Sequence, residues 1–209
     1  MAAAPDPASR RDVVVVMCRG ESRRFGGPKA LAVLDDDPRP LLRRVVDLHA
    51  GTGYAPVVIV TTGELAPGCA ALVANLPDVR VTTAPGGGDT ARTLAAAWDV
   101  LAELAPGWSH AWLHPVDVPT ISAATLAQLA VVSGLMPDRQ VRPGWNGRPG
   151  HPVVLPARVF AELLADARTS PGPWRVVLEG AVRAGRVPGP VTVAVADPGV
   201  VLDHDVRPA

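Results

Sequence analysis

A run of four valines, Val13–Val16, passes directly into a loop rich in glycine and basic side chains, and this junction constrains the fold more than any other stretch. A strand that is apolar on both faces is typical of a parallel sheet covered on both sides. Glycine lets backbone N–H groups approach an anion closely, and basic side chains neutralise its charge. The junction therefore predicts a phosphate-binding loop built from Gly20, Ser22, Arg24, Gly26, Gly27 and Lys29.

Residue spacing distinguishes this loop from two other phosphate-binding loops. A P-loop requires Ser or Thr directly after its lysine, whereas Ala30 follows Lys29, and no G-x-G-x-x-G pattern follows the strand. The pattern is G-x-S-x-R-x-G-x-x-K, which resembles the signature loop of the MobA-like nucleotidyltransferases. That family includes the molybdenum-cofactor cytidylyl- and guanylyltransferases. The alternative interpretation is a basic surface loop between a strand and a helix.

The whole chain, at 209 residues, is long enough for one large domain with a substantial core. Its 20 Lys and Arg balance its 20 Asp and Glu, so the global charge argues for neither nucleic acid nor a membrane as a partner. With only Cys18 and Cys69, no disulfide framework is implied, and the expected location is the cytoplasm. We expect residues 1–11 to be a flexible tail and residues 12–209 to form a single domain.

Hydrophobic periodicity predicts alternating strands and helices after the loop. Strands are expected at residues 57–60, 79–83, 108–114, 139–142, 153–155 and 191–196. Helices are expected at residues 41–48, 65–76, 90–104, 122–132 and 176–185. The strands at 139–142 and 153–155 are interpreted as a hairpin that covers a cleft. The alternation predicts a mostly parallel sheet between two layers of helices. The resemblance implies one three-layer α/β domain of the nucleotide-diphospho-sugar transferase (GT-A-like) type.

A second glycine-rich loop, residues 86–88, precedes the helix expected at 90–104. In the MobA-like family, a segment at this place lies near the nucleotide base and ribose. The resemblance therefore implies a nucleotide site that includes Thr61, Gly87, Gly88 and Thr93. Composition alone fits a flexible linker equally well.

An acidic residue, Asp117, follows the strand expected at 108–114 and lies between Pro115 and Pro119. The carboxyl end of a parallel strand faces the crevice in which α/β sheets bind ligands. The stretch resembles the P-x-D-x-P element of the family, whose aspartate binds Mg²⁺. The alternative is that Asp117 caps the next helix, a position that Thr120 and Ser122 can already fill.

Two further segments resemble the family near the end of the chain. Gly150-His151-Pro152 is similar to the G-H-P-V segment of the cytidylyltransferase branch, and this implies that His151 contacts the substrate. The alternative is a histidine that only satisfies its own loop. Asp203-His204-Asp205 matches the first half of the closing D-I-D-T-P-E-D motif, so Asp205 or Asp203 is the candidate second ligand for Mg²⁺.

Together, these resemblances imply an Mg²⁺-dependent enzyme that transfers a nucleoside monophosphate to a phosphorylated small molecule such as molybdopterin. CTP is the favoured donor, Arg24 and Lys29 are the expected phosphate-binding cations, and Asp117 and Asp205 are the expected metal ligands. Both monomers and dimers occur in the family. Met17-Cys18-Arg19-Gly20 departs from the small residues usual before the serine, which weakens the assignment of the base. The alternatives are an enzyme that uses another NTP and a sugar or metabolite phosphate as acceptor, or a catalytically weakened nucleotide-binding protein.

Overall fold

The computed structural model describes residues 11–19, 25–34, 37–85, 90–169 and 174–204. Its strands are β1 (Asp12–Met17), β2 (Val57–Thr61), β3 (Val79–Thr83), β4 (His110–Pro115), β5 (Val141–Trp145), β6 (Arg148–Pro149), β7 (Val153–Pro156) and β8 (Val191–Ala194). Its helices are α1 (Leu41–Ala50), α2 (Ala66–Val73), α3 (Thr90–Leu104), α4 (Ala123–Leu135), α5 (Ala157–Thr169) and α6 (Trp174–Arg183), with short 3₁₀ turns η3 (Lys29–Leu31) and η4 (Pro198–Val201).

A single mixed sheet runs through the domain in the order β3-β2-β1-β4-β7-β5-β6, and β8 also pairs with β5. Strands β3, β2, β1 and β4 are parallel to one another, while β7 is antiparallel to both β4 and β5. Met17 at the end of β1 pairs with Val60 in β2 and with Pro115 in β4. The loops that follow these three strands therefore begin side by side at one edge of the sheet.

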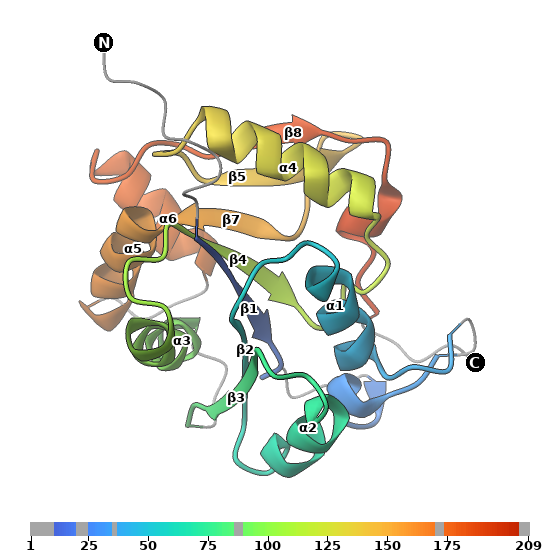
Figure 1. Ribbon diagram of the computed structural model, residues 1–209. Helices are drawn as coiled ribbons and strands as arrows, with labels where there is room; N and C mark the ends of the chain where they lie inside the picture. Colours follow the sequence, from blue (N-terminus) through green and yellow to red (C-terminus); the bar gives the residue numbers. More distant parts are fainter. Residues whose placement is uncertain (1–10, 20–24, 35–36, 86–89, 170–173, 205–209) are drawn as a thin grey trace.

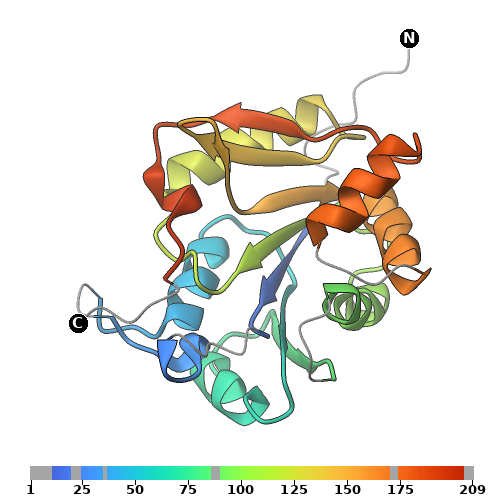
Figure 2. The same cartoon turned by 180° about the vertical axis from the view of Figure 1, so that it is seen from behind.

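Helices cover both faces of the sheet, as the valine run predicts (Figures 1 and 2). Val14 and Val16 pack in one core with residues of α1, α2 and α4. Val13 and Val15 pack in a second core with residues of α3, α5 and α6. All four side chains are fully buried, and successive side chains of a strand point to opposite faces. This confirms the predicted three-layer α/β fold.

The hairpin predicted to cover a cleft is part of the main sheet. Strand β5 does pair with β7, through Val141 and Val154, but β7 is inserted between β5 and β4. All of Val153–Pro156 is buried, so this strand is apolar on both faces and suits the interior of a sheet. The tight hairpin is instead formed by β5 and β6 around Asn146 and Gly147, which have positive φ angles of 48° and 75°.

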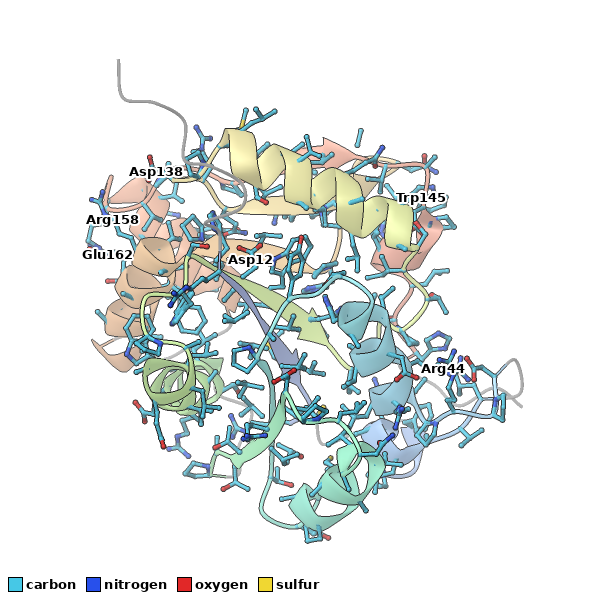
Figure 3. All side chains as sticks on the ribbon, in the orientation of Figure 1. Asp12, Arg44, Asp138, Trp145, Arg158 and Glu162 are labelled. Atoms are coloured by element: carbon cyan, nitrogen blue, oxygen red, sulfur yellow. The ribbon has the colours of Figure 1, made fainter. Side chains whose placement is uncertain are left out.

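Two buried charged side chains secure the sheet and the segment that leads into α1 (Figure 3). At the amino end of β1, Asp12 accepts a hydrogen bond of 2.8 Å from the indole N–H of Trp112 in β4. On α1, Arg44 donates to the carbonyl groups of Leu34, Asp37 and Arg39.

No helix among the described residues is long and apolar enough to cross a bilayer.

Candidate active site

The described part of the first loop is anchored to the core at both ends. Phe25 and Ala30 are buried, whereas the stretch from Gly26 to Pro28 between them is exposed. Gly26 has a φ of 77°, a conformation that side chains with a Cβ rarely adopt. The loop therefore presents its backbone to solvent between two fixed points. Of its predicted binding residues, Gly20, Ser22 and Arg24 lie outside the described residues.

The fold brings the two principal predicted catalytic residues together. The Nζ of Lys29 lies 3.1 Å from the Oδ2 of Asp117, although the two residues are 88 positions apart. Lys29 is buried, and the Asp117 side chain is 27% exposed. Val116 and Val118 on either side of Asp117 are buried, so their packing directs the carboxylate away from the core. The backbone N–H of Val116 also donates to the carbonyl of Met17, which joins the turn to β1.

The carboxyl-terminal segment returns to the same place. The N–H of His204 donates to the carbonyl of Asp117 over 2.9 Å. This segment is held by Asp197, whose carboxylate accepts hydrogen bonds from Ser122 and Thr125 at the start of α4 and from the N–H of Gly199. Burial raises the pKa of Asp197, but these hydrogen bonds outweigh burial and lower it. Asp205 lies outside the described residues.

His151 stands beside the Asp117 turn, with its own backbone fixed by a bond from its N–H to the carbonyl of Val200. Burial lowers the pKa of His151 and Arg142 lowers it further, while the carboxylates of Asp117 and Asp203 act in the opposite direction. The net shift is downward, so the ring is neutral at pH 7. Its Nδ1 is buried and has no hydrogen-bond partner among the described residues. A neutral imidazole in this position is able to bind a substrate group.

Gly150 is required for the approach of this loop to η4. A Cβ at position 150 would lie 2.3 Å from the carbonyl oxygen of Val200, a backbone atom that cannot rotate away. We expect Gly150→Ala to destabilise the protein by about 1–3 kcal/mol and to displace His151. Urea unfolding measures the loss of stability, and substrate affinity measures the effect of displacing His151. Gly63→Ala is the control, because nothing lies within 4 Å of a Cβ there. Equal stabilities of the two variants would contradict the argument.

Two predicted nucleotide-binding threonines have hydrogen bonds inside the protein. The hydroxyl of Thr93 accepts a bond of 2.7 Å from Nη1 of Arg19, and Nη2 of Arg19 donates to the carbonyl of Pro85. Arg19 thus joins the end of β1 to both ends of the second glycine-rich loop. Thr61 is fully buried and donates to the carbonyl of Cys18 over 3.4 Å. Gly87 and Gly88 lie outside the described residues. The assignment of these four residues to the nucleotide site stays a prediction.

Cys18 is buried in the same core as Phe25 and Ala30. Burial raises the pKa of its thiol well above the usual value, and Cys69 and Asp117 raise it further. Because the thiolate is the nucleophilic form, Cys18 is an inert, neutral side chain at pH 7.

A pair of buried histidines behind the Asp117 turn was not identified from the sequence. The Nε2 of His49 in α1 lies 2.7 Å from the Nδ1 of His114 in β4, and the Nε2 of His114 lies 2.8 Å from the carbonyl oxygen of Val118. Neither ring is exposed to solvent. His49 lies four positions after Val45, on the apolar face of α1, and this placement is the sequence signal that indicates its burial.

The two histidines make the stability of the protein depend on pH. Burial lowers the pKa of His114 from 6.5 to about 4, and burial and the neighbouring His114 lower that of His49. Between pH 6.5 and about 4, the unfolded chain therefore binds protons that the folded protein does not. We expect the free energy of unfolding to fall on acidification through this window, by up to about 1.4 kcal/mol per pH unit for each histidine.

Urea unfolding in steps from about pH 7 to about pH 5 measures this slope. The variant His49→Gln removes one of the two titrating groups, so its slope should be shallower. Identical slopes for the variant and the unmodified protein would show that His49 does not contribute.

The oxygen donors at the site suit a hard divalent cation. Among the described residues, no three His, Cys, Asp or Glu side chains are grouped so as to hold a metal. Mg²⁺ is usually bound through one or two carboxylates together with substrate phosphates, so such a group is not required. Asp117 fits a cation whose remaining ligands come from a nucleotide.

The fold and the family comparison define the class of the protein. The chain belongs to the MobA-like NTP transferase family, whose model matches residues 14–184. These findings support a nucleotidyltransferase. No curated protein sequence matches the chain significantly.

Solved structures with the same fold come from several organisms. Rv0371c from Mycobacterium tuberculosis is 25% identical, with a TM-score of 0.70 and 94% of each chain covered. A nucleotidyl transferase from Methanothermobacter is 19% identical, with a TM-score of 0.70 and coverage of 94% of this chain and 92% of that one. A 4-diphosphocytidyl-2C-methyl-D-erythritol synthase from Anaerococcus prevotii is 8% identical, with a TM-score of 0.70 and coverage of 95% and 92%.

Proposed function

We propose that the protein is an Mg²⁺-dependent nucleotidyltransferase that transfers a nucleoside monophosphate, with CTP as the favoured donor, to a phosphorylated small molecule such as molybdopterin. The observation that carries the proposal is the 3.1 Å contact between Lys29 and Asp117 where the parallel strands end. Nucleotidyl transfer needs a cation for the phosphates and a carboxylate for a divalent metal at one place. Both groups lie together here in a chain of the MobA-like family.

The reaction requires positioning and charge neutralisation. A phosphate oxygen of the acceptor forms a bond to the α-phosphorus of the NTP, and the bond from that phosphorus to pyrophosphate breaks. Neither group needs a protein base, since the attacking oxygen is already anionic. Lys29 and Arg24 bind the β- and γ-phosphates and stabilise the charge on pyrophosphate. Asp117 and Asp205 hold the cation, and His151 binds the acceptor. When bound, Mg²⁺ would supply positive charge that neutralises the reacting phosphates.

Structural neighbours support the finer parts of the proposal. Rv0371c has been crystallised in complex with manganese, and that structure is 24% identical and covers 89% of this chain. This supports a divalent cation in a related fold. Preference for CTP is supported by the Gly150-His151-Pro152 segment and is consistent with the 4-diphosphocytidyl-2C-methyl-D-erythritol synthases among the neighbours.

A thermal-shift experiment with CTP, GTP, ATP and UTP, each with and without Mg²⁺, tests the proposal. A ligand that binds only the folded state at about 100 times its Kd stabilises that state by about 2.7 kcal/mol. For a protein of this size, we expect a rise in Tm of roughly 5–10 °C, dependent on Mg²⁺ and largest with CTP. A larger shift with another nucleotide would reassign the donor. No shift with any of the four would contradict the proposal.

One observation favours the alternative of a catalytically weakened nucleotide-binding protein. The guanidinium of Arg19, two residues after β1, is already bonded to the hydroxyl of Thr93 in α3 and to the carbonyl of Pro85. Pyrophosphate release in the presence of CTP and molybdopterin separates the two functions. A Tm shift without any pyrophosphate release would support the binding protein.

A further inference from the structure

A one-way chain of hydrogen bonds runs from α1 through the core to the Asp117 turn. The carbonyl oxygen of Val118 can only accept, so the Nε2 of His114 must carry the proton of that bond. In a neutral ring, the Nδ1 of His114 is then an acceptor, and the Nε2 of His49 must donate to it. The remaining Nδ1 of His49 carries no proton, and it has no hydrogen-bond partner among the described residues. Both rings are thus held in the Nε2–H tautomer.

This chain of bonds ends on the carbonyl of Val118, the residue that directly follows Asp117. The other backbone groups of the turn are bonded to their surroundings: the N–H of Val116 to Met17, the N–H of Val118 to Pro115, and the carbonyl of Asp117 to the N–H of His204. The histidine bond is the contact that reaches the turn from within the core. It fixes the plane of the Val118–Pro119 peptide, and it thereby restrains the turn from which the Asp117 carboxylate projects.

The cost of placing two imidazoles in the core indicates a specific role. Both rings are fully buried, and His49 also packs edge-on against Trp112, in a region otherwise filled by apolar side chains. Polar groups in such a place destabilise the fold unless their hydrogen bonds are made, whereas leucine would fill similar space at no such cost. The geometry specifies a donor directed at one carbonyl rather than a general packing function.

We propose that His49 and His114 are positioning residues, which orient Asp117 for binding a divalent cation. The inference rests on the proposed function, because it takes Asp117 as the metal ligand. Outer hydrogen-bond partners of metal ligands commonly change metal affinity by about 10–100-fold when they are removed. Here the outer partner acts on the backbone next to the ligand, from the core side of the turn.

Two substitutions at His49 separate the hydrogen bond from the volume of the ring. His49→Leu fills the space but removes the donor, whereas His49→Gln keeps an N–H at the position of Nε2. His110→Leu is the matched control, since His110 is also buried in β4 but at the opposite end, where its Nε2 faces the carbonyl of Pro137. The readout is Mn²⁺ affinity of the full-length protein, measured by electron paramagnetic resonance with and without CTP.

We expect His49→Leu to weaken Mn²⁺ binding about tenfold or more, and His49→Gln and His110→Leu to stay near the unmodified protein. Equal losses of Mn²⁺ affinity in His49→Leu and His110→Leu would show that His49 has a merely structural role and would overturn the inference. Unchanged Mn²⁺ binding in His49→Leu would overturn it as well. If His49→Leu fails to fold, ¹⁵N spectra of the five histidine rings in the unmodified protein test the inference instead. An Nδ1–H tautomer at His49 or His114 is incompatible with the chain of hydrogen bonds and would overturn the inference.

These outcomes remain separable from those of the proposed function. If the unmodified protein binds Mn²⁺ but releases no pyrophosphate with any of the four nucleotides, the proposed activity is wrong, and the Mn²⁺ affinities of the variants still decide the positioning role. If the unmodified protein binds no Mn²⁺ even with CTP, the positioning role is overturned.

Discussion

Asp117→Asn should lower kcat for pyrophosphate release by about 100-fold or more while the protein stays folded. Asparagine has almost the same shape as aspartate but carries no charge, so the cation loses its ligand and Lys29 loses an ion-pair partner 3.1 Å away. The bonds that hold the turn involve backbone groups, and these remain in the variant. The rate with CTP and molybdopterin, measured across a range of Mg²⁺ concentrations, checks the prediction, and thermal unfolding checks the fold.

Asp138→Asn is the matched control for charge removal. Asp138 is exposed and follows Pro137, the residue that contacts His110 at the amino end of β4, so it lies at the opposite edge of the sheet (Figure 3). The kcat of Asp138→Asn for pyrophosphate release should equal that of the unmodified protein. Undiminished Mg²⁺-dependent turnover in Asp117→Asn would show that Asp117 is not the metal ligand.

Lys29→Met should also lower kcat by about 100-fold, because it removes the cation that we propose stabilises the leaving pyrophosphate. Methionine fills the buried volume of the lysine chain, so the loss reports charge rather than packing. In the double variant that combines Lys29→Met with Asp117→Asn, the fold-reduction in kcat should be smaller than the product of the two single reductions. The reason is that both groups are proposed to act on the same phosphates. Single-turnover kinetics of the two single variants and the double variant measure this coupling.

Lys29→Arg should restore little of the activity, although it keeps the charge. Lys29 is the only lysine in a chain with 19 arginines, so this position keeps an ammonium where the composition strongly favours guanidinium. The ammonium is a compact point charge in a buried site, whereas the guanidinium fork is wider and planar. A Lys29→Arg variant with full activity would show that only charge is needed here.

Much of the fold follows from local sequence patterns. The strands at residues 57–60 and 79–83 appear as β2 and β3, and the helix predicted to open near Ser122 is α4, capped by Ser122 itself. These predictions hold because side-chain period and capping chemistry act over a few residues. The predicted role of the strands at 139–142 and 153–155 as a hairpin that covers a cleft was wrong. The sequence indicates that Val153–Leu155 is buried on both faces, but it does not indicate which strands lie beside it.

The candidate site, like the fold, has features that local sequence patterns predict and features that they do not. Motifs are enough to give the residue types and their order: a glycine- and cation-rich loop after a buried strand, an aspartate between two prolines after another, and a histidine before a proline. They therefore suffice to name Lys29, Asp117 and His151. Motifs carry this information because the chemistry of phosphates and metals restricts which side chains serve at each position.

Which of these groups meet, and which contacts support them, depends on how the whole chain folds. The 3.1 Å contact between Lys29 and Asp117 depends on β1 and β4 being neighbours in register, which no local pattern specifies. The bonds of Arg19 to Thr93 and of His49 to His114 join residues 74 and 65 positions apart. Hydrogen bonds between buried side chains are directional and leave no periodic trace in the sequence, so the support of the Asp117 turn became visible only when the chain was folded.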